Sequence, residues 1–232
     1  MRTKIFCDIA DLSIIKKFNK KKLVKGFTTN PSLIRKAGAR NYKSYSKKIL
    51  EICRNKPVSL EVFGDDNGTM IEQGMKISSW GRNVYVKVPI VNSKNKFTGK
   101  VIKKLNSEGI KLNITAVYTS KQVEKILKII NNKANVIISI FAGRAGDIGK
   151  DPVPEFMKSI KIAKKFNNVE ILWASVREPY NYIQAKQLGC HIITIPPSII
   201  EKIENFGKSF DQLTQETVKT FLTDSKKSNF SI

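Results

Sequence analysis

Short apolar runs alternate with amphipathic stretches along almost the whole chain. The runs are rich in β-branched residues and have the length of strands. They cover residues 4–8, 23–29, 58–63, 84–90, 110–115, 136–141, 169–174 and 191–195. The stretches between them carry apolar residues at helical spacing, as at Val123, Ile126 and Leu127. The pattern therefore predicts strands and helices in alternation.

Polar residues at the segment boundaries predict where individual helices begin. Asn30 and Ser32, on either side of Pro31, are both available to cap the helix that follows 23–29. Ser120 is the expected cap of the helix that contains Val123. The glycine-rich stretch 143–147 is expected to form a loop.

Eight strand-and-helix units within about 200 residues are typical of a parallel (β/α)8 barrel, the TIM barrel of the α/β class. A doubly wound sheet shows the same alternation, but no glycine-rich fingerprint follows the strand 4–8. We therefore assign residues 1–205 to one barrel. Residues 206–224 are expected to form an additional C-terminal helix, and residues 225–232 a flexible tail.

The chain carries a formal charge of +23, mostly from lysine, which far outnumbers arginine. This usage is consistent with codon bias in an AT-rich genome. A protein that binds nucleic acid or another polyanion is the alternative from a different functional class. The lysines are scattered, however, and aromatic residues are not interleaved with a basic stripe. We expect no specific nucleic-acid partner.

Cysteine and histidine usage argues against a metal centre. Cys7, Cys53 and Cys190 are far apart and share no ligand spacing with His191, the single histidine. Reduced thiols indicate a cytoplasmic protein. No apolar stretch approaches ~18 residues, and the first residues run directly into a strand, so neither a membrane span nor a signal peptide is expected.

One lysine lies where the pattern predicts a buried strand. Lys87 is in the middle of Val-Tyr-Val-Lys-Val-Pro-Ile, residues 84–90, where an ammonium is costly unless it is paired or deprotonated. A neutral amine attacks a carbonyl to form a Schiff base, so Lys87 is the candidate nucleophile. The alternative is a lysine that snorkels from the strand end to solvent.

Polar residues occur late in seven of the eight predicted strands or directly after them. A barrel collects its catalytic groups at this end of its strands, and buried polar groups need partners, so their recurrence indicates one shared site. They are Asp8; Thr28 and Asn30; Glu61; Lys87; Asn113 and Thr115; Ser139 with Arg144; and Ser175 with Arg177.

The types of these residues indicate their chemistry. Asp8 and Glu61 are carboxylates that could move protons around a Schiff base, and Thr115 could position a water. The amides and hydroxyls of Asn30, Asn113 and Ser139 suit a polyhydroxylated substrate. The guanidinium groups of Arg144 and Arg177 match phosphate. Each arginine could instead form a salt bridge to Asp147 or Glu178, and we favour phosphate binding.

Six motifs formed by these residues resemble those of the transaldolase family. They are D-I-A-D at 8–11, G-F-T-T-N-P-S-L at 26–33, V-K-V-P at 86–89, L-N-I-T at 112–115, F-A-G-R at 141–144 and W-A-S-V-R at 173–177. The chain is similar to the small single-barrel transaldolases and their fructose-6-phosphate aldolase relatives, in the same order, from residue 4 to about 200.

The resemblance implies a reaction on a ketose phosphate, either sedoheptulose 7-phosphate or fructose 6-phosphate. Lys87 would attack the C2 ketone, and Asp8 would take the C4 hydroxyl proton as the C3–C4 bond breaks. Glu61 and Thr115 would hold the water that shuttles protons. The dihydroxyacetone unit would pass to glyceraldehyde 3-phosphate or erythrose 4-phosphate, a step of the pentose phosphate pathway that needs no cofactor.

The resemblance also implies which residues bind the substrate. Thr28, Asn30, Asn113, Ser139 and Phe141 would line the sugar site, while the phosphate site would consist of Arg144, Ser175 and Arg177.

Two positions of the resemblance bear on the reaction type. Transaldolases resemble this chain in having Glu at position 61 and Phe at position 141, whereas the aldolases tend to have Gln and Tyr there. A fructose-6-phosphate aldolase remains the alternative. Val176 stands where Thr is usual, which removes a hydroxyl beside the phosphate site. The C-terminal helix would pack on a neighbouring subunit of a homo-oligomer, in a ring of five or in a decamer of two such rings.

Overall fold

Eight parallel strands form a closed barrel in the structure, a computed structural model that describes residues 3–228. The strands are β1 (Lys4–Asp8), β2 (Val24–Thr28), β3 (Val58–Glu61), β4 (Val84–Pro89), β5 (Leu112–Val117), β6 (Val136–Phe141), β7 (Val169–Ala174) and β8 (Ile192–Ile195). Each strand pairs with the next in chain order, and β8 pairs with β1. The predicted (β/α)8 barrel is confirmed.

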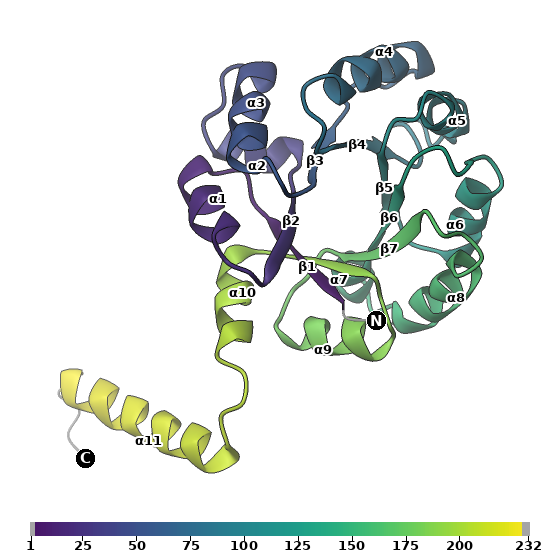
Figure 1. The fold of residues 1–232 in the computed structure, drawn as a ribbon. Helices are drawn as coiled ribbons and strands as arrows, with labels where there is room; N and C mark the ends of the chain where they lie inside the picture. The colour runs from purple at the N-terminus through teal and green to yellow at the C-terminus, as the bar shows by residue number, and fades with distance from the viewer. Residues whose placement is uncertain (1–2, 229–232) are drawn as a thin grey trace.

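Helices surround the barrel as an outer ring (Figure 1). The described helices are α1 (Leu12–Asn19), α2 (Pro31–Lys36), α3 (Tyr42–Ile52), α4 (Asn67–Ser78), α5 (Gly99–Ser107), α6 (Ser120–Leu127), α7 (Ala142–Gly146), α8 (Val153–Ala163), α9 (Tyr180–Gln187), α10 (Pro197–Glu204) and α11 (Phe210–Lys227), of which α11 lies outside the ring. Among residues 3–228, no helix is both long and apolar enough to cross a membrane.

Two local predictions were wrong. Thr119, not Ser120, caps α6. Thr119 has an extended backbone, its hydroxyl accepts from the backbone N–H of Gln122, and its own N–H donates to the Gln122 side chain. The stretch 143–147 is not a loop, since 142–146 form the short helix α7. Of the two possible caps of α2, the structure uses Asn30.

Apolar side chains fill the lower part of the barrel and form a dry floor. Phe6, Tyr85, Ile137, Leu172 and Ile192 pack together there with little or no exposed surface. Gly26 makes room for Phe6, because a Cβ at residue 26 would lie 2.6 Å from the phenylalanine ring. Polar side chains above this floor are therefore separated from water at the lower end of the barrel.

The pairing of β2 with β3 is short, and a tyrosine extends it. The two strands pair only at Phe27–Val58 and Thr28–Ser59, so Glu61 lies beyond the last ladder pair. The Tyr42 hydroxyl on α3 accepts a hydrogen bond from the Glu61 N–H at 2.9 Å and donates one to its C=O at 3.1 Å. Tyr42 thus satisfies the backbone of Glu61 where β2 does not.

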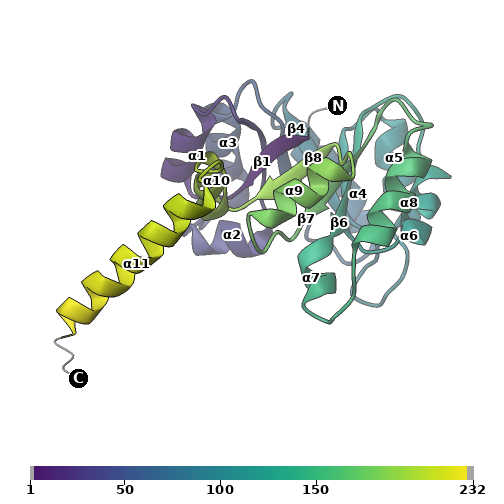
Figure 2. The same cartoon turned by 90° about the horizontal axis from the view of Figure 1, so that it is seen from below.

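The helix α11 extends away from the barrel (Figures 1 and 2). All of its described residues are exposed, including Phe210 at 88% and Phe221 at 69%. The helix begins at Phe210, later than the expected residue 206. It continues through Lys227, so residues 225–227 are helical and do not belong to the expected tail 225–232. Residues 229–232 lie outside the described part of the chain.

Tyr42→Phe should lower the free energy of unfolding by about 1–3 kcal/mol, because the backbone N–H and C=O of Glu61 lose their shared partner. Equilibrium unfolding in urea measures this change. Tyr180→Phe is the matched control, since Tyr180 is 53% exposed and should tolerate the substitution. An equal effect of the two variants would contradict the role of Tyr42 in holding Glu61.

Candidate active site

The predicted polar residues meet in one cavity of about 250 Å3 at the carboxyl end of the strands. The structure brings eleven of the twelve candidates to its wall: Asp8, Thr28, Asn30, Lys87, Asn113, Thr115, Ser139, Phe141, Arg144, Ser175 and Arg177. The twelfth candidate, Glu61, is not among the lining residues, but its carboxylate lies 3.1 Å from the amine of Lys87, which is. Residues spread over 170 positions of sequence thus share one site, because β1 to β7 end on the same side of the barrel.

Lys87 is buried and has two polar partners. Its side chain on β4 is directed into the barrel, where Nζ lies 3.1 Å from Glu61 Oε2 and donates to the Thr29 carbonyl at 3.0 Å. In the strand register, Lys87 pairs with Glu61 on β3 and with Asn113 on β5. Only 7% of Lys87 is exposed, so the alternative of a lysine that snorkels to open solvent is wrong.

Asp8 is the second carboxylate near Lys87. Burial raises the pKa of Asp8, and Glu61 raises it further, while Lys87 and a 2.7 Å hydrogen bond donated by Thr28 act in the opposite direction. Burial is the largest of these effects. Asp8 therefore binds a proton at higher pH than an ordinary aspartate, which suits a group that takes up and returns a proton.

Hydrogen bonds fix the amide of Asn113. Its Nδ2 donates to Ser59 Oγ at 2.9 Å, and its Oδ1 accepts from Ser139 Oγ at 2.7 Å. Thr115, two residues further along β5, has a buried hydroxyl without a hydrogen-bond partner among the described residues. Such a group is suited to bind a water or a substrate hydroxyl.

Asn30 has a structural role as well as a place in the cavity. Its Oδ1 accepts from the Leu33 amide at 2.9 Å and thereby caps α2. The capping bond orients the side chain and leaves the amide nitrogen for another partner.

The arginines lie at the rim of the cavity. The Arg177 guanidinium forms an ion pair with Asp147 through Nε and Nη2, and this contact lowers the pKa of Asp147. Arg177 therefore forms the salt bridge to Asp147 that was the alternative to phosphate binding. Its Nη1 does not contact Asp147. No carboxylate within residues 3–228 forms a salt bridge with Arg144.

Close backbone packing holds the two arginine-bearing segments together. Ser175 has a positive φ of 63°, and its hydroxyl accepts from the Arg144 amide at 3.2 Å. A Cβ at Gly143 would lie 1.9 Å from the Ser175 carbonyl oxygen and 2.9 Å from Arg177 Cγ. Only glycine permits this approach, so Gly143 fixes the distance between the end of β6 and the end of β7.

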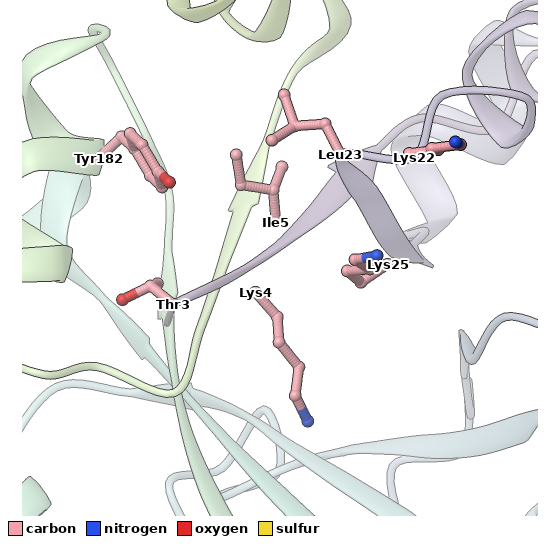
Figure 3. A pocket seen from close by; sticks show the side chains of 7 residues that line it. All are labelled: Thr3, Lys4, Ile5, Lys22, Leu23, Lys25 and Tyr182. Carbon is pink, nitrogen blue, oxygen red and sulfur yellow. The ribbon is translucent and has the colours of Figure 1, made fainter. Parts of the chain in front are cut away.

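A second cavity, of about 390 Å3, lies at the opposite end of β1 and β2 (Figure 3). Thr3, Lys4, Ile5, Lys22, Leu23, Lys25 and Tyr182 line it. The amines of Lys4 and Lys22 point away from each other, and Lys4 is paired with Glu170. Because no carboxylate is among the lining residues of this second cavity, we assign the chemistry to the smaller cavity.

Three contributors to the site were missed by the sequence prediction. Ser59 and the Thr29 carbonyl contact predicted residues, and Thr194 on β8 lines the cavity. Thr194 could have been found, because it is a polar residue late in the eighth apolar run. A backbone carbonyl such as that of Thr29 carries no signal in the sequence.

The model of the family described as Transaldolase/Fructose-6-phosphate aldolase matches residues 5–232. A probable transaldolase of Nitrosopumilus maritimus is 36% identical over 92% of this chain and 97% of that protein. One from Herpetosiphon aurantiacus is 34% identical over 95% and 94%, and one from Thermoplasma volcanium is 36% identical over 97% and 96%.

Solved structures with the same barrel are more distant in sequence. 3-Hexulose-6-phosphate synthase from Salmonella typhimurium superposes with a TM-score of 0.61 at 15% identity, over 87% of this chain and 91% of that one. Dihydrodipicolinate synthase from Rhodopseudomonas palustris gives 0.59 at 10% identity, over 96% and 79%. At these identities the likeness extends to the fold alone.

Asp8→Asn should stabilise the protein increasingly as the pH rises above about 4, the ordinary range of an aspartate pKa. Folding raises the pKa of Asp8, so the ionised carboxyl opposes folding once the unfolded chain has lost its proton. Thermal unfolding of both proteins from pH 4 to 8 measures the difference.

Asp66→Asn is the matched control with the opposite sign. Hydrogen bonds from Thr69 lower the pKa of Asp66, so the advantage of the wild-type protein over this variant should grow only up to the ordinary aspartate range of about pH 4 and stay constant above it. A pH-independent difference for Asp8→Asn would contradict the raised pKa of Asp8.

Proposed function

Because the chain belongs to the transaldolase/fructose-6-phosphate aldolase family, we propose that it transfers a dihydroxyacetone unit from a ketose phosphate to an aldose phosphate. The observation that carries this proposal is the buried Lys87, paired with Glu61 and facing a cavity that Asp8 also lines. A nucleophile and two proton acceptors in one enclosed site are the requirements of Schiff-base chemistry.

The first step joins Lys87 to the substrate. The ammonium gives a proton to Glu61, 3.1 Å away, and the neutral amine attacks the C2 ketone to form a carbinolamine. Loss of the C2 hydroxyl as water leaves an iminium ion. Glu61 returns the proton that this leaving hydroxyl needs, and the unpartnered hydroxyl of Thr115 holds the departing water.

The second step breaks the C3–C4 bond. Asp8 removes the proton of the C4 hydroxyl, the C4 oxygen forms the carbonyl of the leaving aldose phosphate, and the bonding electrons move into the iminium to give an enamine. In the reverse sense, C3 of the enamine attacks the carbonyl of the acceptor and Asp8 returns its proton. Hydrolysis of the new iminium then frees Lys87.

Substrate recognition follows from the remaining polar groups. The amide of Asn113 and the hydroxyl of Ser139 are hydrogen-bonded to each other, so they present fixed partners to the hydroxyls of the three-carbon unit. Asn30 offers its free amide nitrogen, and Thr28 lines the wall beside Asp8. Arg144, Ser175 and the free Nη1 of Arg177 would bind the phosphate at the rim.

Transfer is favoured over simple cleavage by the cavity wall. Phe141 presents an apolar ring there, packed against Tyr118 with ring centroids 5.9 Å apart. A ring without a hydroxyl cannot position a water to protonate the enamine, which therefore waits for an aldose acceptor. We propose sedoheptulose 7-phosphate or fructose 6-phosphate as donor and glyceraldehyde 3-phosphate or erythrose 4-phosphate as acceptor, in the pentose phosphate pathway of the cytoplasm.

The exposed helix α11 supports a homo-oligomer. Phe210, Leu213, Val218, Phe221 and Leu222 recur at helical spacing and are all more than half exposed. Most of the stability of a helix in a protein comes from packing of its apolar face, and all 18 residues of α11 are exposed on this chain. We propose that α11 packs on another copy of the chain, in a ring of five or a pair of such rings.

Borohydride reduction in the presence of fructose 6-phosphate tests the mechanism. We expect a reduced three-carbon adduct on Lys87, located by peptide mass, and its loss when erythrose 4-phosphate is added before reduction. Lys87→Met should abolish the adduct. Lys25→Met is the matched control at the opposite end of the barrel and should leave it unchanged.

Two other outcomes would redirect the proposal. Rapid release of free dihydroxyacetone without any acceptor would identify an aldolase. The absence of an adduct with every ketose phosphate tested would overturn the Schiff-base mechanism.

Gly143→Ala should raise the KM for a phosphorylated donor about 10–100-fold, the equivalent of one lost charge-assisted hydrogen bond. The new Cβ cannot coexist with the Ser175 carbonyl, so the segments that carry Arg144 and Arg177 must separate. Steady-state kinetics measure this effect.

Gly146→Ala is the matched control in the same short helix, because a Cβ there meets no atom within 4 Å. Borohydride trapping of unphosphorylated dihydroxyacetone on Lys87 should be unaffected in both variants. An unchanged KM in Gly143→Ala would argue against a phosphate site between the two arginines.

A further inference from the structure

A chain of hydroxyl groups leads from β8 across the barrel to Asp8. Thr194 Oγ1 lies 2.5 Å from Thr28 Oγ1, and Thr28 Oγ1 lies 2.7 Å from Asp8 Oδ1. Both threonines are buried, with 6% and 3% of their surface exposed. Thr28 on β2 is in register with Asp8 on β1, and Thr194 on β8 is in register with Phe6, so the hydroxyl of Thr194 approaches that of Thr28 from a lower level of the barrel.

The direction of these hydrogen bonds follows from the number of protons. A threonine hydroxyl carries one proton, and an ionised carboxylate only accepts. When Thr28 donates its proton to Asp8, the short contact between the two hydroxyls requires Thr194 to be the donor to Thr28. Thr194 thereby prevents the Thr28 hydroxyl from turning away from Asp8.

We propose that Thr194 is a positioning residue that holds Thr28 as a hydrogen-bond donor to Asp8 and so keeps Asp8 in the ionised form that takes up the substrate proton. The inference deepens the proposed function and rests on it for the role of Asp8. The polarisation of one hydroxyl by the next strengthens the bond to the carboxylate, because hydrogen bonds in a chain are cooperative.

The charged groups around Asp8 act on the same protonation equilibrium, and Lys87 favours the ionised form more strongly than the Thr28 hydrogen bond does. Lys87 favours the ionised form of Asp8, whereas Glu61 disfavours it, and both belong to one ion pair. The neighbouring Cys7 thiol is buried, which raises its pKa and keeps it neutral. Arg144 and Arg177 line the same cavity from the ends of β6 and β7. From β8, Thr194 is the group that hydrogen-bonds towards Asp8.

The test is the pH dependence of kcat/KM for the transfer reaction in Thr194→Val, which keeps the shape of threonine and removes its hydroxyl. We expect the acid limb of the profile to move up by about 0.5 pH unit, as the weakened bond to Asp8 favours its protonated form. Thr194→Ser, which retains the hydroxyl, should restore the wild-type limb.

Thr3→Val is the matched control. Thr3 is also buried and donates to the Cys190 carbonyl at 2.8 Å, but it lies at the opposite end of the barrel. The Thr3→Val variant should lose about as much stability as Thr194→Val, but the acid limb of its kcat/KM profile should not move. An acid limb that is the same in Thr194→Val and the wild type, or that moves equally in Thr3→Val, would overturn the proposal.

A second measurement separates this inference from the proposed function. The carboxyl 13C resonance of Asp8, identified by its loss in Asp8→Asn, reports the titration of Asp8 without substrate. It should titrate at higher pH in Thr194→Val than in the wild type, whether or not the protein forms an adduct with a ketose phosphate. An unchanged titration would refute the role of Thr194, whereas failure of borohydride trapping would refute the Schiff-base function alone.

Discussion

The ion pair between Lys87 and Glu61 is the interaction on which the site depends. Taking an ammonium into a barrel costs several kcal/mol, and a single partner removed from such a pair leaves an uncompensated charge. The fold meets this cost with Glu61 at 3.1 Å and the Thr29 carbonyl at 3.0 Å. Glu61 lies on β3 and Thr29 directly follows β2, so the register of β2, β3 and β4 fixes the position of the amine.

The barrel separates its supporting layer from its reactive layer. Phe6, packed over Gly26, and Tyr85 fill the lower part of the interior, while the hydrogen-bonded Asn113 and Ser139 form the layer above. This arrangement keeps water from below away from Lys87. It also lowers the stability of the folded protein, because burial raises the pKa of Asp8 and the ionised carboxyl opposes folding.

The protein has many cationic side chains, but few of them line the cavity. Of the many cationic side chains, Lys87, Arg144 and Arg177 line it. Asp147 neutralises part of Arg177 at the rim. The net charge of +23 surrounds the site with a field that attracts anionic molecules in general, while the cavity itself holds three cationic side chains.

The sequence by itself determined the order of strands, the barrel and the residue types of the site. Short apolar runs of strand length are a local signal, so Lys87 within such a run and Asp8 at the end of another could be identified without coordinates. Only the tertiary structure decided the partners. Thr194 is hydrogen-bonded to Thr28, 166 positions away in the sequence, and Arg177 forms its salt bridge with Asp147 and not with Glu178. Such contacts depend on register and closure of the barrel, which no local pattern encodes.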